Sequence, residues 1–536
     1  MMRSQIIQKD SKLIGDELIE KFISQDKKVL KYIDSFYSNE SLKKHSENRT
    51  KNFTKEQRQI LVKSLKSQYS NIDISKKTSE NISSLSQSNT FCITTGHQLN
   101  LFTGPLMVIF KIAQVISISN QLNLDSKNFK YVPVLWIASE DHDFEEISEV
   151  NLNQKNIKWE INSNNLPVGE IEINNFKNVM KDYKDSIIDY DFKEKIEEII
   201  DFSYKEGDTL SISTIKFINS LFSEHGLIII DANKKDLKSL FIDQLKNEID
   251  NFSCKENTTS QISELKKDFE SYKVQVNPSD INFFKLTDKG RKRIRYDKKL
   301  FNVDDENSYN KDEIMNLIDK SPELFSPNAI MRPLYQEIVL PNVCYVGGPN
   351  ELRYWMQLKT YFDDNKVQFP ILKLRNSAFI IDSKTSKKIK KSGIEIKYFI
   401  GELKELVNYK IQNTSSFKLN FDSLRSNLSS QFDELRKVSL KTDKSFIGAL
   451  NAQEKKQKKG IDDLEKKLNK AEKKNHEAEI ESIRSIYNYL HPFNINQERY
   501  LNFGNFYSCK GSSFINYIVE KISIMDDKIL IIHLED

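Results

Sequence analysis

The sequence predicts an α/β fold, with a parallel sheet in its core and a C-terminal coiled-coil domain of two long helices. Residues 91–150 read as a strand, a turn, an apolar helix and a second strand, and the same βαβ rhythm returns at residues 211–230. This alternation is typical of a parallel sheet. After residue 384, apolar side chains recur every three or four positions among Glu and Lys. That spacing is typical of amphipathic helices in an antiparallel coiled coil.

The composition narrows the class of protein. With 536 residues, the chain is long enough for two or three domains. Lys and Arg total 81 and Asp and Glu total 77, so the net charge of +4 gives no basis for general nucleic-acid binding. No stretch approaches the length of a transmembrane helix, and the four cysteines form no CxxC pair. We therefore expect a cytoplasmic protein with reduced thiols that binds neither nucleic acid nor a membrane.

The first 384 residues form the predicted core. Apolar and charged positions at helical spacing predict several helices over residues 1–85. Two less regular segments, at about residues 151–205 and 255–330, interrupt the βαβ rhythm, and we interpret them as insertions. Residues 283–296 read as a hairpin whose second strand is basic.

The coiled coil occupies residues 385–490. Pro492 is expected to end its second helix, because proline cannot continue a helical hydrogen-bond ladder. Residues 491–536 contain another helix and a strand-like run, and we expect this segment to return to the core.

The turn after the first strand carries the first candidate site. It contains Gly96, His97 and Gln98. A second turn, with Thr103 and Gly104, precedes the apolar helix. Glycine permits close backbone approach, and imidazole and amide groups can donate to an oxyanion or a phosphate. The spacing matches neither a Walker A loop nor the dinucleotide-binding fingerprint, and a structural histidine at a strand end is the alternative interpretation.

The second candidate site follows the strand-like run at residues 131–138. Asp141, His142 and Asp143 stand there among further glutamates. Such a cluster suits a divalent metal, a general base oriented by a carboxylate, or an ammonium group. An acidic first turn of a helix is the structural alternative. It accounts for the glutamates at 145 and 146 but poorly for the clustered aspartates and histidine. With no HExxH motif or dispersed histidine set, we assign no metal ligands.

The third candidate site joins another strand to a helix. Gly347 and Gly348 leave backbone amides available for an anionic group. Asn350, followed by Glu351, is predicted to cap the helix. Arg332 precedes this strand and could reach the same cleft; a surface position is the alternative.

A basic hairpin offers a further anion site or, alternatively, a solvated sheet edge that deters strand pairing. Its cationic side chains are Lys289, Arg291, Lys292, Arg293 and Arg295.

Because the carboxyl ends of parallel strands meet at one edge of a sheet, the loops centred on residues 97, 142 and 347 are expected to share one pocket. Two or more unrelated loops that merely end strands are the alternative.

Three motifs resemble those of the bacillithiol-biosynthesis cysteine-adding enzyme family. They are GHQLNLFTGPLMVIFKI at 96–112, PVLWIASEDHDFEEI at 133–147 and VCYVGGPNELRYWMQL at 343–358. With the coiled coil, the resemblance spans essentially the whole chain. It implies a Rossmann-like, nucleotidyltransferase-type core with connecting insertions, and a coiled-coil domain that forms a homodimer.

The resemblance also implies an activity: a ligase that joins the carboxyl of cysteine to the amine of glucosaminyl-malate. A carboxylate must be activated before it acylates an amine, so ATP, with Mg²⁺, is expected. By likeness to class I synthetases, His97 would handle nucleotide phosphates. A coiled-coil scaffold or binding protein with a degenerate Rossmann core, and a metal-dependent hydrolase, are the alternative functions.

In the ligase hypothesis, the amides of Gly347 and Gly348 face phosphates or the malyl carboxylates. Asp141 or Asp143 holds the substrate ammonium, and His142 removes a proton from the attacking amine.

Overall fold

The computed structural model describes residues 2–8, 16–153, 155–163, 165–303, 307–414, 421–439, 445–522 and 528–535. The chain divides into two compact units. The larger comprises residues 2–379 and 498–532, and the smaller comprises residues 380–497 with the last residues from 533 onward.

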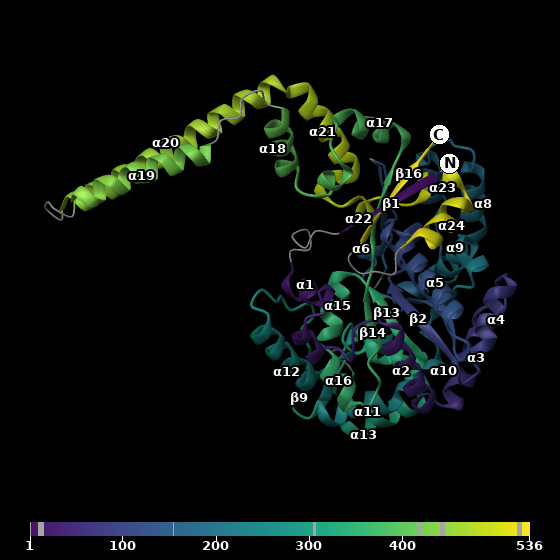
Figure 1. Ribbon diagram of the computed structural model, residues 1–536. Coiled ribbons are helices and arrows are strands. Elements are labelled where there is room, and N and C mark those ends of the chain that lie inside the picture. The colour runs from purple at the N-terminus through teal and green to yellow at the C-terminus, as the bar shows by residue number, and fades with distance from the viewer. Residues whose placement is uncertain are drawn as a thin grey trace. The chain divides into compact units, whose positions relative to one another are not determined.

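A five-stranded parallel sheet forms the centre of the larger unit (Figure 1). Its spatial order is β14-β13-β2-β3-β6, which is 3-2-1-4-5 when these five strands are numbered along the chain. That is the order of the Rossmann fold, so the predicted fold class is confirmed. The strands are β2 (Thr90–His97), β3 (Lys130–Ile137), β6 (Ile228–Asp231), β13 (Asn342–Gly347) and β14 (Ile371–Leu374).

Both faces of this sheet are covered, because nearly every residue of its five strands is buried. The apolar helix α5 (Met107–Asp125) joins β2 to β3 and packs against both. The helices α2 (Asn39–Asn52), α3 (Lys55–Gln68) and α4 (Lys76–Ser84), with α1 (Glu17–Ile23), account for the helices predicted near the N-terminus. A further helix, α9 (Leu210–Phe222), leads into β6.

Two long connections leave the sheet, one after β3 and one after β6. The connection after β3 holds α6 (Phe144–Ile147), β4 (Glu149–Leu152), β5 (Lys155–Lys158), α7 (Lys177–Ser186) and α8 (Lys193–Ser203). The connection after β6 holds α10 (Lys235–Lys238), α11 (Ile242–Asn251), α12 (Ser253–Asp268), β9 (Arg295–Asp297), β10 (Leu300–Asn302), β11 (Ser308–Tyr309), α13 (Lys311–Lys320) and α14 (Arg332–Val339).

The second connection also carries an antiparallel sheet, ordered β12-β7-β8. Its strands are β7 (Phe283–Thr287), β8 (Gly290–Arg293) and β12 (Phe325–Pro327). Thr287 pairs with Gly290 across a two-residue turn, so the predicted hairpin is confirmed.

The last part of the chain packs on the larger unit. It contributes α22 (Gln497–Tyr500), α23 (Gly504–Lys510), α24 (Ser512–Lys521) and β16 (Lys528–Leu534). The helix α24 packs against α5. The strand β16 lies between β1 (Met2–Gln8) and β15 (Ser377–Ile381). After β13, the chain also forms α15 (Pro349–Met356) and α16 (Lys359–Asp364).

The smaller unit is helical. It contains α17 (Ser383–Ser392), α18 (Leu403–Thr414), α19 (Phe421–Ser439), α20 (Ser445–Asn475) and α21 (Glu477–Leu490). The helices α19 and α20 lie side by side and antiparallel (Figure 1): Arg425 binds Asp462 and Glu465, whereas Arg436, further along α19, binds the earlier Glu454. The predicted coiled-coil hairpin is confirmed.

The second helix of the coiled coil differs from the prediction in one respect. A turn at His476 divides it into α20 and α21, so the apolar repeat does not make one continuous helix. The end of α21 at Leu490, two residues before Pro492, agrees with the prediction. Among the described residues, no helix is both long and apolar enough to span a membrane.

Candidate functional site

The carboxyl ends of the central strands surround one cavity of about 490 Å³. Gly96 and His97 end β2, Asp141 follows β3, and Gly348 and Glu351 follow β13, and all five line this cavity. The chain runs from β2 to β3 on one side, whereas β13 lies on the other side of β2. Rossmann-like proteins bind ligands at such a switch point, and the volume suits a small molecule.

The structure brings together most, but not all, of the residues proposed from the sequence. Those that line the cavity are Gly96, His97, Gln98, Asp141, Arg332, Gly348, Asn350 and Glu351. Those that lie outside its lining are Thr103, Gly104, His142, Asp143 and Gly347. All three predicted loops therefore reach one cavity.

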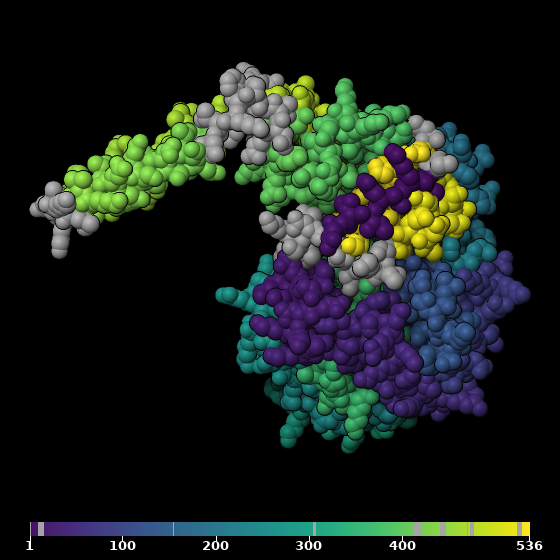
Figure 2. Space-filling view, viewed as in Figure 1, coloured from purple at the N-terminus to yellow at the C-terminus, as the bar shows by residue number. Residues whose placement is uncertain are grey.

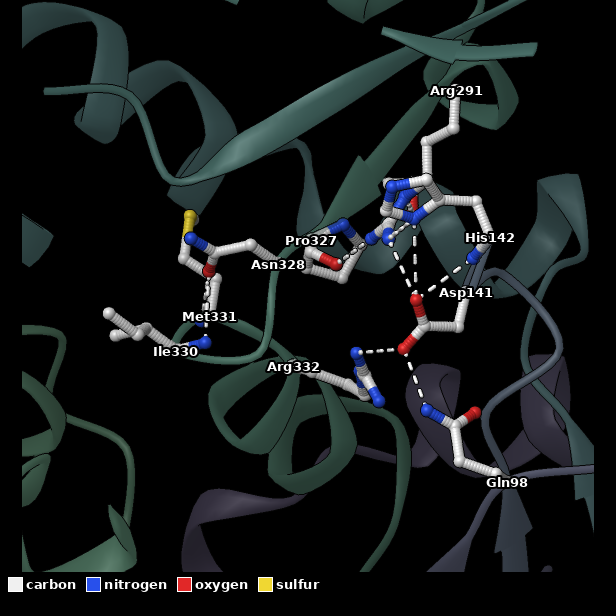
Figure 3. Close-up of polar contacts among 10 residues, drawn as sticks. Gln98, Asp141, His142, Arg291, Pro327, Asn328, Ile330, Met331 and Arg332 are labelled. Carbon is white, nitrogen blue, oxygen red and sulfur yellow. Dashed lines mark hydrogen bonds and ion pairs between the residues drawn. The ribbon is translucent and has the colours of Figure 1, made fainter. Parts of the chain in front are cut away.

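Asp141 is the centre of a charged network (Figure 3). One carboxylate oxygen accepts hydrogen bonds from Gln98 (2.8 Å) and Arg332 (3.2 Å). The other accepts the backbone N–H of His142 (2.9 Å) and lies 3.4 Å from a guanidinium nitrogen of Arg291. Burial opposes the charge of Asp141, but His142 and the two arginines outweigh it and hold the pKa well below its usual range. Two cations already balance this carboxylate, so the predicted role of holding a substrate ammonium is not supported.

Arg291 shows that the basic hairpin is not simply a solvated edge. Its side chain is buried, its guanidinium stacks 4.0 Å from the centre of the Phe284 ring, and it donates to the backbone oxygen of Pro327 at 2.7 Å. The nearby Arg293 and Arg295 are exposed, as expected for a solvated edge. Arg291 thus joins the second insertion to the loop after β3.

His142 and Asp143 have local roles in the structure. The His142 ring lies 3.4 Å from a carboxylate oxygen of Asp141 and 3.3 Å from Arg291, and its side chain is 38% exposed. Asp143 caps α6 by accepting the backbone N–H of Glu146 at 3.3 Å. Asp143 therefore fits the alternative interpretation, a helix start favoured by an acidic residue.

The backbone amide of Gly348, the residue after β13, is not free for a ligand. The backbone N–H of Gly348 donates to the Glu351 carboxylate at 2.6 Å, and Gly348, not Asn350, occupies the N-cap position of α15. The predicted cap is therefore wrong, because α15 begins at Pro349 and Asn350 lies inside its first turn, where its side-chain oxygen accepts from Arg353. The other oxygen of Glu351 accepts from Lys111 (2.8 Å) and from the hydroxyl of Tyr345 (2.9 Å).

The turn at Thr103 and Gly104 is structural. Both residues have positive φ angles, of 70° and 65°. A Cβ on Gly104 would meet Asn100 at 2.7 Å. Asn502 donates to the carbonyl oxygen of Gly104 at 2.6 Å. These contacts explain why position 104 is a glycine, with no need for a bound ligand.

His97 is held in its neutral form. Burial and the positive charges of Lys111 and Arg375 lower its pKa to about 3, against the opposing effect of Glu351. Its Nε2 atom is buried and makes no hydrogen bond to any residue in the described part of the chain. A neutral imidazole at the cavity wall can donate to, or accept from, a bound molecule.

Three cationic residues of the lining were not singled out from the sequence. They are Lys111, Arg375 and Arg499. Lys111 is buried and donates to the carbonyl oxygen of Gly96 at 2.8 Å. The one signal that could have revealed it is a lysine within the otherwise apolar start of α5. Arg375 directly follows β14, so the pattern of a polar residue after a buried strand could have revealed it, whereas no such pattern marks Arg499.

The fold defines a Rossmann-like protein that has a cavity of small-molecule size at its switch point and carries a coiled-coil domain. The family model for the N-terminal Rossmann-like domain of bacillithiol biosynthesis BshC matches residues 2–376, and that for its C-terminal coiled-coil domain matches residues 378–534. The chain belongs to the bacillithiol biosynthesis BshC family.

The chain is similar in sequence to three relatives over nearly their whole length, and each bears the name "Putative cysteine ligase BshC". The relative from Flavobacterium psychrophilum is 39% identical over 96% of this chain and 95% of its own. The one from Christiangramia forsetii is 38% identical over 96% of each chain. The one from Flavobacterium johnsoniae is 37% identical over 95% of this chain and 96% of its own.

Proposed function

We propose that this protein is a ligase of bacillithiol biosynthesis that forms an amide between the carboxyl of cysteine and the amine of glucosaminyl-malate. The names of its relatives support a cysteine ligase. The observation that carries the proposal is the cavity at the switch point, whose lining contains four cations, three carboxylates and a neutral histidine from separate parts of the chain. Such a lining suits substrates that carry both carboxylate and ammonium groups.

The chemistry requires an activated carboxyl group. In the proposed reaction, ATP transfers an adenylyl group to the carboxylate of cysteine and releases pyrophosphate, or transfers a phosphoryl group and releases ADP. The amine then attacks the activated carbonyl carbon, loses a proton, and displaces AMP or phosphate. Arg332, oriented by Asp141, would stabilise the anionic leaving group, and His97 would donate a hydrogen bond to an oxygen of the reacting centre.

Mg²⁺ would arrive with the nucleotide. Among the described residues, no group of three or more His, Cys, Asp or Glu side chains is arranged to hold a metal ion. Phosphate oxygens and water commonly supply most of the ligands of Mg²⁺ in nucleotide-dependent enzymes.

We further propose that two copies associate through α19 and α20. Five large apolar side chains of this hairpin are exposed: Leu424, Leu435, Val438, Phe446 and Leu464. Figure 2 shows the hairpin uncovered on its visible side, except where grey atoms hide it. A second copy packed along it would remove these side chains from water.

A direct assay tests the proposed reaction. The purified full-length protein is incubated with cysteine, glucosaminyl-malate, Mg²⁺ and each nucleoside triphosphate in turn, and mass spectrometry measures the thiol product. We expect product with ATP, together with equimolar AMP or ADP, and none when ATP is omitted. Absence of product with every nucleotide would contradict the proposal, and product without nucleotide would contradict activation by ATP.

A further inference from the structure

Arg499 reaches the cavity from the far end of the sequence. It lies on the short helix α22, about 400 residues beyond β2. Its neighbour Glu498 is almost fully buried and binds both terminal nitrogens of Arg375, each at 2.9 Å. Glu498 also accepts the backbone N–H of Ala378 at 3.1 Å. This paired contact fixes the residue before Arg499 against the end of β14.

The residues after Arg499 are held equally well. The carbonyl oxygen of Leu501 accepts the backbone N–H of Leu106 at 2.8 Å. The side chain of Asn502 is buried and donates to the carbonyl oxygen of Phe102 at 2.8 Å. The backbone on both sides of Arg499 is therefore held by contacts of Glu498, Leu501 and Asn502. These contacts place Arg499 at the cavity without any contact of its own side chain.

The other three cations of the lining have anionic partners. Lys111 is paired with Glu351 (2.8 Å), and Arg332 is paired with Asp141 (3.2 Å). Arg375, the third, is paired with Glu498, as described above. Arg499 is exposed and makes no hydrogen bond or close ion pair within the described ranges. Desolvation and the charge of Arg375 lower its pKa, against the opposing effect of the more distant carboxylates of Glu498 and Glu351. Its charge is thus available to a molecule in the cavity.

We infer that Arg499 binds an oxyanion of a substrate and thereby selects anionic substrates for this site. The inference rests on the proposed function, in which two substrates carry such groups: the malyl carboxylates of the amine substrate and the phosphates of ATP. A guanidinium binds either in the same bidentate manner.

Kinetics of Arg499→Gln and Arg499→Lys test the inference, with Arg293→Gln as the matched control. Arg293 is exposed in the same unit and lies outside the cavity lining. We expect Arg499→Gln to raise the KM of one substrate by about 10- to 100-fold, Arg499→Lys to raise it less, and Arg293→Gln to leave it unchanged. All three variants should keep the wild-type unfolding temperature, because the anchors of α22 remain.

The substrate whose KM increases identifies the oxyanion that Arg499 binds. An increase in KM for glucosaminyl-malate, with no change for methyl glucosaminide, assigns Arg499 to the malyl carboxylates. An increase in KM for ATP assigns it to a phosphate. Unchanged KM values for both substrates in Arg499→Gln would overturn the inference.

A binding measurement separates this inference from the proposed reaction. Isothermal titration of glucosaminyl-malate and of ATP into wild-type protein and Arg499→Gln needs no turnover. Wild-type binding that weakens at least tenfold in Arg499→Gln supports the inference even if no amide forms. Equal binding by both proteins, or binding of neither compound by the wild type, overturns it.

Discussion

At the scale of single residues, Asp141 has a positioning role. It binds Arg332, which lines the cavity, and Arg291. These two guanidinium groups balance the negative charge of Asp141. We predict that Asp141→Asn lowers kcat about 100-fold, since one neutral amide cannot balance and orient two guanidinium groups. Steady-state assays of amide formation measure this.

Asp143→Asn is the control for that variant. Asn caps a helix as well as Asp does, and Asp143 lies outside the cavity lining. Its kcat should therefore stay within about threefold of wild type. A loss in Asp143→Asn as large as that in Asp141→Asn would contradict these separate roles.

His97 makes stability depend on pH. Its pKa is about 3 in the folded protein and about 6.5 when unfolded. Above pH 6.5 both states hold a neutral ring, whereas between pH 6.5 and 3 only the unfolded state takes up the proton, so stability falls as the solution is acidified. We predict that the wild type loses about 2 kcal/mol more than His97→Asn between pH 7.5 and 5.

Calorimetric unfolding of both proteins over this pH range provides the measurement. Parallel pH dependence in the two proteins would show that His97 titrates normally.

These residues also show what the sequence could predict. The turns after β2, β3 and β13 could be located, because a buried strand followed by polar residues is a local pattern. The pairing of Asp141 with Arg291 could not, because it joins residues 150 positions apart.

At the scale of elements, the turn around Gly169 braces the loop that carries Asp141. Its backbone N–H donates to the carbonyl oxygen of Ser139 at 2.8 Å, and that of Val168 donates to the carbonyl oxygen of Asp141 at 2.6 Å. A Cβ at position 169 would meet Cβ of Ser139 at 2.5 Å and its backbone at 3.0 Å. We predict that Gly169→Ala displaces this loop, lowers stability by about 1–3 kcal/mol and reduces kcat.

Gly460→Ala is the control for Gly169→Ala, because it adds the same methyl group at an uncrowded position. Position 460 lies within α20, and its Cβ would meet no atom within 4 Å. Removing a mid-helix glycine should stabilise the helix by up to about 1 kcal/mol without changing kcat. Thermal unfolding and activity assays compare the two variants, and equal effects would contradict the bracing contact.

Helices and strands that are set by a local apolar pattern could be predicted from the sequence, and those set by distant or irregular contacts could not. The central strands and the paired helices α19 and α20 could be predicted, because their apolar periods are long. The break at His476 and the cap at Gly348 could not. The first interrupts a regular apolar repeat, and the second arises because Glu351 folds back onto the amide.

At the scale of the whole molecule, the exposed apolar side chains of α19 and α20 predict a dimer. Leu464→Glu should dissociate it, because a second copy would place this side chain, 61% exposed in a single chain, in an apolar interface. Leu124→Glu, at a position 82% exposed on α5, should not. Light scattering after gel filtration measures the mass of each variant; a monomeric wild type, or a dimeric Leu464→Glu, would contradict the proposed interface.

The arrangement of distant segments was the least predictable feature. The Rossmann order follows from the βαβ rhythm, but the placement of Arg499 depends on Arg375 and Glu498, which are 123 positions apart. No local pattern in either segment indicates that pairing.

The proposed function depends on one claim: that the cavity at the ends of β2, β3 and β13 forms the amide. The most direct measurement is mass-spectrometric detection of the cysteine–glucosaminyl-malate amide formed by wild-type protein and by Arg332→Gln under identical conditions with ATP. The wild type should form the product, and a folded Arg332→Gln should form it at least 100-fold more slowly. Equal rates in the two proteins, or no product from the wild type, would contradict the claim.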